Sequence, residues 1–345
     1  MKILIISNGH GEDLVGAALS EKLTGHKISA LPIVGEGKAY ENKGCQILGP
    51  RKKLPGGGFS LRHLPSLISD LQSGLFGNIL EIYRVIKQQN ADLVIAIGDI
   101  VPLIFSKLVK APLVFIGVNK SDYYKWFGYS YTPWEIQLLK KAKIVFTRDQ
   151  LTADNLSKKG VNAKFVGNPL MNNLQLPTSN VQTNPKSQTL NPKLIGLLPG
   201  TRIKDKELNL KDFEILKTEI NKIDKDIMFE IATKENFKRV LSESKLIIGL
   251  SGTGNEQAAG LGIPVVSFPG LGSQYTKKFG QAQKQLLGDA LSFIPERAFI
   301  KIAQNVLDIL KDPQKNKSMS QAGKERMGGI GAIDNISNYV LSNSK

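Results

Sequence analysis

The sequence predicts an α/β protein with two Rossmann-like domains that face a cleft. Short apolar runs, which are typical of buried parallel strands, alternate with helical segments along the chain. The alternation stops at a polar stretch, residues 175–193, and then starts again. Glycine-bearing turns follow the first strand of each half. In parallel sheets, ligands bind at the carboxyl ends of the strands, where these turns lie. In a protein with two such halves this end faces the cleft between them, so we expect the site there.

In the first half, strands are predicted at residues 3–6, 28–34, 45–48, 93–97, 113–117, 144–147 and 163–166. Helices are predicted at residues 14–23, 78–88, 100–109 and 149–158. These elements define a first domain, residues 1–174, followed by a linker at residues 175–193 that contains three prolines.

The second half repeats the pattern, with strands predicted at residues 194–198, 227–232, 246–250 and 263–268. Helices are predicted at residues 212–223, 255–261, 299–310 and 314–327. We expect a second domain at residues 194–330. A last segment, residues 331–345, contains a helix that we expect to pack back on the first domain.

Composition favours a globular protein with anionic partners. The chain has 345 residues, of which 41% are hydrophobic and 22% charged. Lys and Arg outnumber Asp and Glu by 46 to 30, which gives a net charge of +16. This excess favours nucleotide phosphates or an anionic membrane surface, although a general excess of surface lysines is the alternative. No aromatic-rich basic run or helix-turn-helix pattern indicates nucleic-acid binding.

The sequence also indicates a cytoplasmic location. Its single cysteine, Cys45, fits a reducing compartment, and no Cys/His cluster indicates a metal. The chain begins directly with a predicted strand, so no signal peptide is expected. No uninterrupted apolar run is long enough for a transmembrane helix.

A glycine-rich turn after residues 246–250 predicts a phosphate site. Ser251, Gly252, Thr253 and Gly254 turn the chain into a helix, and such turns aim backbone N–H groups and a helix N-terminus at an anion. Glu256 is expected in the first helical turn, where it would repel a phosphate unless it faced a sugar diol. The pattern therefore predicts a nucleotide-sugar site, with an ordinary βα turn as the alternative.

Two further turns carry polar residues toward the same kind of site. Thr201 and Arg202 follow the first strand of the second domain, where an arginine can pair bidentately with a phosphate. Asp99 follows the strand at residues 93–97 and is a candidate general base, or else a cap for the helix that begins at Ile100.

The turn after the first strand holds a third group of candidates. It comprises Asn8, Gly9, His10, Gly11, Glu12 and Asp13. Its glycine spacing does not match the dinucleotide fingerprint G-x-G-x-x-G. His10 is a candidate catalytic residue, while Glu12 and Asp13 are candidate substrate ligands or first-turn acids that stabilise a helix dipole.

Residues 54–76 are rich in apolar side chains and glycine, and a basic cluster, Arg51-Lys52-Lys53, precedes them. This pattern predicts a segment that binds an anionic membrane surface. A buried core helix with a glycine loop is the alternative.

Taken together, these motifs resemble the lipid-A-disaccharide synthase family, in particular its related branch in cyanobacteria and plastids. The resemblance rests on SNGHGEDLVGAAL, GNPLMNNL, LLPGTR and SGTGNEQAAGLGIP, which occur in the family's order and span nearly the whole chain. It implies a GT-B fold and an inverting transfer from a UDP-sugar, without a metal or other cofactor. It also implies that the donor binds the second domain and that the acceptor, a lipid, lies against the first.

The resemblance assigns roles by position. Glu256 would bind the uridine ribose hydroxyls, and Gln281 would lie near the donor sugar. The diphosphate would face Ser251, Gly252, Thr253, Thr201 and Arg202, with Gly254 and Gln257 completing the donor site. His10 or Asp99 would take the proton of the acceptor hydroxyl.

Two departures from the family keep other functions open. The family's D-x-P-D segment is replaced by Gly98-Asp99-Ile100-Val101, and residues 233–245 are a short connection in the donor domain. A UDP-sugar 2-epimerase and a non-catalytic nucleotide-sugar-binding scaffold are therefore the alternatives.

Overall fold

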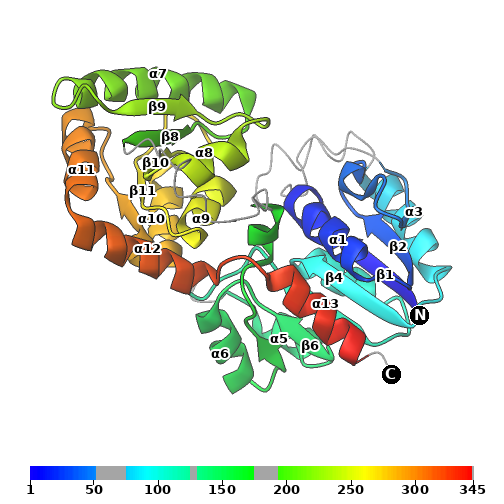
Figure 1. The fold of residues 1–345 in the computed structure, drawn as a ribbon. Helices are drawn as coiled ribbons and strands as arrows, with labels where there is room; N and C mark the ends of the chain where they lie inside the picture. Colours follow the sequence, from blue (N-terminus) through cyan, green and yellow to red (C-terminus); the bar gives the residue numbers. More distant parts are fainter. Residues whose placement is uncertain (52–74, 125–129, 175–192, 344–345) are drawn as a thin grey trace, which may run out of the picture. The chain divides into compact units, whose positions relative to one another are not determined.

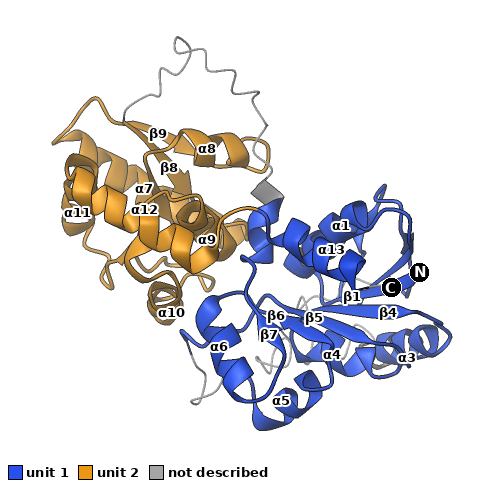
Figure 2. Cartoon of the chain, turned by 60° about the horizontal axis from the view of Figure 1, so that its bottom comes forward, with its two compact units in different colours: residues 1–173, 331–345 blue, residues 174–330 orange. Residues whose placement is uncertain are grey.

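The computed structural model describes residues 1–51, 75–124, 130–174 and 193–343 (Figure 1). The chain forms two compact units (Figure 2). The first comprises Met1–Asn173 and Gly331–Lys345, and the second comprises Leu174–Ile330. Apart from Lys193, the predicted linker lies outside the described residues, and so do residues 54–74 of the predicted membrane-binding segment.

The first unit contains a parallel sheet of seven strands in the order β3-β2-β1-β4-β5-β6-β7. The strands are β1 (Lys2–Ser7), β2 (Lys27–Pro32), β3 (Gln46–Ile47), β4 (Leu93–Gly98), β5 (Leu113–Gly117), β6 (Ile144–Phe146) and β7 (Ala163–Lys164). The helices are α1 (His10–Lys22), α3 (Leu75–Lys87), α4 (Ile100–Ser106), α5 (Pro133–Leu139), α6 (Gln150–Lys158) and α13 (Ala332–Ser342), with short 3₁₀ helices η1 (Lys38–Tyr40) and η3 (Pro169–Leu174).

Both faces of this sheet are buried under helices. Alternate residues of each strand point to opposite faces, so each strand contributes to two cores. Ile3 and Ile5 belong to a core with residues of α1 and α13, whereas Leu4 and Ile6 belong to a core with residues of α3, α4 and α5. A central strand must therefore be apolar at nearly every position, as β1 and β4 are.

The C-terminal helix α13 belongs to the first unit. Ile333, Ile336 and Val340 are buried in the core beside α1, and Lys22 of α1 pairs with Asp334 at 2.7 Å. Asn172 accepts hydrogen bonds from the backbone N–H of Gly331 and of Ile333.

The second unit contains a parallel sheet of five strands in the order β12-β11-β10-β8-β9. The strands are β8 (Leu194–Leu198), β9 (Met228–Ile231), β10 (Leu246–Gly249), β11 (Val265–Ser267) and β12 (Leu291–Phe293). The helices are α7 (Ile203–Asn221), α8 (Phe237–Glu243), α9 (Gly252–Gly260), α10 (Lys277–Leu287), α11 (Phe299–Lys311) and α12 (Pro313–Met327), with the 3₁₀ helix η4 (Gly288–Ala290). The predicted α/β class with two Rossmann-like domains is confirmed.

Several predicted helix boundaries are wrong, among them the starts of three helices. The helices α1, α7 and α9 begin at His10, Ile203 and Gly252, earlier than the predicted 14, 212 and 255. The first N–H groups of a helix have no intrahelical partner, so glycine and polar residues are common there. The apolar periodicity that predicts a helix therefore begins only after its first turn. Consequently residues 10–13 and 252–254 of the predicted turns form the first turns of α1 and α9. Every helix in the described part of the chain is too short or too polar to cross a membrane.

Candidate functional site

In each sheet there is one pair of neighbouring strands on either side of which the strand order runs in opposite directions. In the first unit this pair is β1 and β4, and in the second it is β8 and β10. Ligands of open α/β sheets bind in the crevice at the carboxyl ends of these two strands. The polar turns predicted from the sequence follow these four strands.

In the second unit, the β8 and β10 turns lie side by side. The two strands pair in register, with Leu198 opposite Gly249, and the N–H of Leu250 donates to the carbonyl of Leu198 at 2.9 Å. Gly200 has a φ of +83°, which lets the chain turn sharply after β8 and leaves Thr201 and Arg202 exposed. Arg202 is therefore available for an anion at the end of the sheet.

The α9 N-terminus completes this anion site. Ser251 caps the helix, because its Oγ accepts a hydrogen bond from the N–H of Gly254 at 3.3 Å. Gly252 and Thr253 are the first two residues of the helix, so their N–H groups have no intrahelical acceptor. Together with the helix dipole, these donors favour a phosphate.

Glu256 is buried in the second turn of α9, not in the first turn as predicted. It is the fifth residue of the helix and is only 7% exposed, and its neighbour Gln257 is 6% exposed. Dipole stabilisation falls off within the first turn. The position of Glu256 therefore weakens the interpretation that it serves only to support the helix.

A buried polar network fixes the start of α9. Asn255 donates to the carbonyl of Gly249 at 3.0 Å and to Gln283 at 2.8 Å, and Tyr275 O–H donates to Gln283 at 2.7 Å. The Gln283 amide in turn donates to the carbonyl of Gly252 at 2.8 Å. Gln281, the predicted sugar ligand, is exposed, whereas Gln283 holds the helix start in place.

A second loop, residues 269–276, lies beside the β8 turn. Asp205, in the first turn of α7, accepts hydrogen bonds from the N–H groups of Ser273 at 3.2 Å and Gln274 at 2.7 Å. Gly272 has no room for a side chain, since a Cβ there would lie 2.3 Å from the Asp205 carboxyl. A Cβ on Gly200 would lie 3.2 Å from Gln274 Oε1, which places the loop against the turn. Asp205 was not among the residues predicted from the sequence.

We expect Asp205→Asn to loosen this loop and to weaken nucleotide binding several-fold. The substitution replaces a carboxylate that accepts two N–H groups, and hydrogen bonds to charged groups contribute roughly 1.5–3 kcal/mol. Hydrogen exchange of the Ser273 and Gln274 amides and calorimetric titration of UDP measure the two effects. Asp212→Asn, which removes a partner of Arg297 from the same helix, is the matched control. Unchanged amide exchange at Ser273 and Gln274 would contradict this prediction.

In the first unit, polar residues that follow β1, β4 and β5 form one cluster. Asn8 donates to Asp99 Oδ1 at 3.3 Å, and Asn119 donates to Glu12 Oε1 at 2.5 Å. Asp99 also caps α4, because its Oδ1 accepts from the N–H of Val101 at 3.0 Å. Asp99 therefore serves as a helix cap, the alternative role predicted for it, and it also lies at the end of the sheet where ligands of such folds bind. Asn119 was missed because it follows β5 without a recognisable motif.

Glu12 is the member of this cluster with a strongly perturbed acidity. Its side chain is 9% exposed, and burial raises its pKa from an ordinary value of 4.5 to about 7, with smaller contributions from the negative charges of Asp99 and Asp13. The hydrogen bond from Asn119 acts in the opposite direction. A carboxyl group with this pKa exchanges protons near neutral pH, as a general base or acid requires.

The other predicted residues of this turn have different surroundings. Asp13 accepts a hydrogen bond from Ser7 Oγ at 2.6 Å, and Tyr40 O–H donates to Ser7 Oγ at 2.8 Å, so Asp13 is tied to the core. Gly9 precedes α1, while His10 and Gly11 are its first two residues. The side chain of His10 lies outside the described part of the structure. Within that part, no group of three or more His, Cys, Asp or Glu side chains is placed to hold a metal ion.

Solved structures resemble the whole chain, whereas no family model and no curated protein matches it. UDP-GlcNAc 2-epimerase from Neisseria meningitidis bound to UDP-GlcNAc is 16% identical, with a TM-score of 0.57 over 99% of this chain and 100% of that one. MurG from Acinetobacter baumannii is 16% identical, with a TM-score of 0.61 over 99% of each chain. CalG4, the calicheamicin glycosyltransferase, is 14% identical, with a TM-score of 0.64 over 100% of this chain and 99% of that one. The chain shares the two-domain GT-B fold with these proteins.

Proposed function

We propose that the protein is an enzyme that uses a UDP-sugar, and specifically an inverting, metal-independent glycosyltransferase with a lipid acceptor. The observation that carries the proposal is the end of the β8–β10 pair, where exposed Arg202 lies on one turn and the capped N-terminus of α9 on the other. These groups suit a diphosphate, and the buried carboxylate of Glu256 suits the two hydroxyls of a ribose. The GT-B fold is compatible with this donor, and the neighbours above include a structure with bound UDP-GlcNAc.

The proposed reaction is a displacement at the anomeric carbon of the donor sugar. The acceptor hydroxyl oxygen forms a bond to this carbon as the bond from the carbon to the diphosphate breaks. The hydroxyl proton passes to a base of the first unit, for which His10, Asp99 and Glu12 are the candidates. UDP leaves with the electron pair, and Arg202 and the α9 N-terminus stabilise its charge.

The finer assignment follows the resemblance to the lipid-A-disaccharide synthase family. A lipid acceptor and a cytoplasmic, peripheral membrane location belong to this assignment, with residues 54–76 as the proposed membrane-binding segment. The segment Gly98-Asp99-Ile100-Val101 departs from the family motif, so the acceptor need not be the lipid A precursor.

An epimerase is the second candidate, and the neighbouring carboxyl groups of Glu12 and Asp99 favour it, because epimerisation needs acids and bases around the sugar. A non-catalytic scaffold is the third. It is favoured by the short connection between β9 and β10, which holds only α8.

A binding screen followed by an activity assay tests these functions. We expect UDP and UDP-GlcNAc to raise the melting temperature, since a ligand of the native state stabilises it by mass action. UDP release that requires an added lipid acceptor would support the transferase, and a new epimer formed without an acceptor would identify the epimerase. Binding without either reaction would support the scaffold, and the absence of uridine nucleotide binding would contradict all three.

A further inference from the structure

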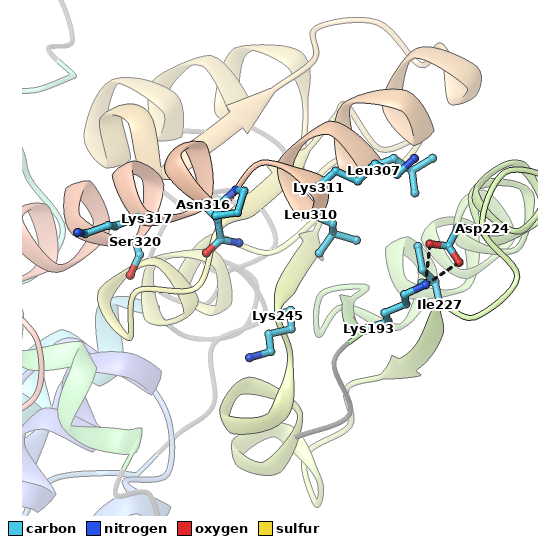
Figure 3. A pocket seen from close by; sticks show the side chains of 11 residues that line it. Lys193, Asp224, Ile227, Lys245, Leu307, Leu310, Lys311, Asn316, Lys317 and Ser320 are labelled. Atoms are coloured by element: carbon cyan, nitrogen blue, oxygen red, sulfur yellow. Dashed lines mark hydrogen bonds and ion pairs between the residues drawn. The ribbon is translucent and has the colours of Figure 1, made fainter. Parts of the chain in front are cut away.

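The second unit has a hollow of about 510 Å³ at the edge of its sheet opposite to the phosphate turns (Figure 3). Lys193, Ile227 and Lys245 line it, and each directly precedes a strand, namely β8, β9 and β10. The end of α11 and the beginning of α12 form the rest of the wall. Because the hollow lies at the amino ends of the strands, its occupant would not compete with a nucleotide at their carboxyl ends.

The rim of this hollow is positively charged. The lining includes four lysines, Lys193, Lys245, Lys311 and Lys317, but a single acid, Asp224. Lys193 binds Asp224 at 3.0 Å and thereby neutralises it. The ammonium groups of Lys245 and Lys317 make no hydrogen bond or ion pair with any residue that the structure describes. An excess of positive charge therefore remains around the hollow.

The wall between the lysines is largely apolar. It is formed by Ile227, Leu307, Leu310 and Pro313. Figure 3 shows Leu310 near the centre, with the labelled lysines spread around it rather than converging on one point. A small inorganic anion would leave this apolar surface uncovered, whereas an anion that carries hydrocarbon would cover it.

We propose that this hollow binds the phosphate headgroup of an anionic phospholipid at a membrane surface. Lys245, Lys311 and Lys317, which are spread around the hollow, attract the anionic headgroups of the membrane surface, and Leu310 and Pro313 contact the glycerol and the first methylene groups of the lipid in the hollow. Charge complementarity selects anionic over neutral lipid, because each lysine near an anionic surface adds to the attraction. The inference rests on the proposed function only in that an enzyme with a lipid acceptor works at a membrane.

Flotation of the full chain with vesicles tests the proposal. The vesicles contain phosphatidylcholine alone or with phosphatidylglycerol, at low and high salt. The test variant is Lys245→Glu/Lys317→Glu. The control variant, Lys158→Glu/Lys159→Glu, changes the net charge equally on the exposed end of α6 in the first unit. Melting temperature and UDP titration show whether each variant is folded and whether the nucleotide site is intact.

We expect wild type and the control to bind the anionic vesicles, and the test variant to bind them about tenfold more weakly. Equal binding by all three proteins would overturn the proposal and would place membrane binding elsewhere, for example in residues 54–76. Absence of wild-type binding to anionic vesicles would also overturn it. Stabilisation of wild type but not of the test variant by inorganic phosphate, without vesicle binding, would identify a site for a soluble anion instead. UDP titration reports separately on the proposed function, so failure of one is distinguishable from failure of the other.

Discussion

Replacing Glu256 by glutamine is expected to weaken UDP binding about tenfold or more while leaving the melting temperature close to that of wild type. The proposed partners of the carboxylate are two ribose hydroxyls. Losing hydrogen bonds to a charged group costs roughly 1.5–3 kcal/mol, and each 1.4 kcal/mol is a factor of ten in affinity. Glutamine has nearly the same shape as glutamate, so packing around this buried position should change little. Calorimetric titration of UDP into both proteins measures the difference.

The alternative role for Glu256 makes a different prediction. If the carboxylate served only to stabilise α9, the variant would melt at a lower temperature and bind UDP as tightly as wild type. Glu243→Gln, at the exposed end of α8 in the same unit, is the control for a Glu-to-Gln change away from the site. Equal UDP affinity of wild type and the Glu256 variant would exclude Glu256 as the ribose ligand.

The second large effect concerns Glu12 and pH. Folding raises the pKa of Glu12 from 4.5 to about 7. Between pH 4.5 and 7, Glu12 therefore keeps its proton in the folded state, whereas it loses the proton in the unfolded chain. This contribution to stability is fully present below pH 4.5 and is lost as the pH rises to about 7. Since one pKa unit corresponds to about 1.4 kcal/mol, the loss amounts to about 3 kcal/mol.

Glu12→Gln should remove most of this dependence, because the neutral amide resembles the protonated acid at every pH. We expect the pH dependence of the first unit's melting temperature to become flatter between pH 4.5 and 7, and the variant to be more stable than wild type above pH 7. Asp154→Asn, on the exposed face of α6 in the same unit, is the control for loss of one negative charge. A variant whose melting temperature follows the wild-type pH profile would show that Glu12 does not titrate in this range.

The strands of both sheets could be predicted from the sequence more accurately than the helices. Central strands such as β1 and β4 are buried on both faces, so their sequences are nearly continuous apolar runs. The strand β12, Leu291–Phe293, was not predicted. The helix α10 was missed because glycine, glutamine and lysine make up most of it, although Phe279, Ala282, Leu286 and Leu287 recur at helical spacing.

The turns of the candidate site could also be located, but not the residues that support them. Arg202, Ser251 and Asp99 follow strands directly, so their placement at the sheet ends follows from the parallel architecture. Asp205 contacts a loop that is 68 residues away in the chain, and Asn119 contacts Glu12 across 107 residues. Such contacts depend on which strands become neighbours, and local sequence patterns contain no record of that order.

The membership of α13 in the first unit has a consequence for how the chain is completed during synthesis. The second unit is an insertion, since the first unit is built from residues before 174 and after 330. Until residues 331–343 leave the ribosome, the surface of α1 that packs against Ile333 and Ile336 stays uncovered, although the rest of that unit was made first. A fragment ending near residue 173 would keep this apolar surface exposed. Joining residue 173 to residue 331 by a short linker would add α13, which would cover the surface again.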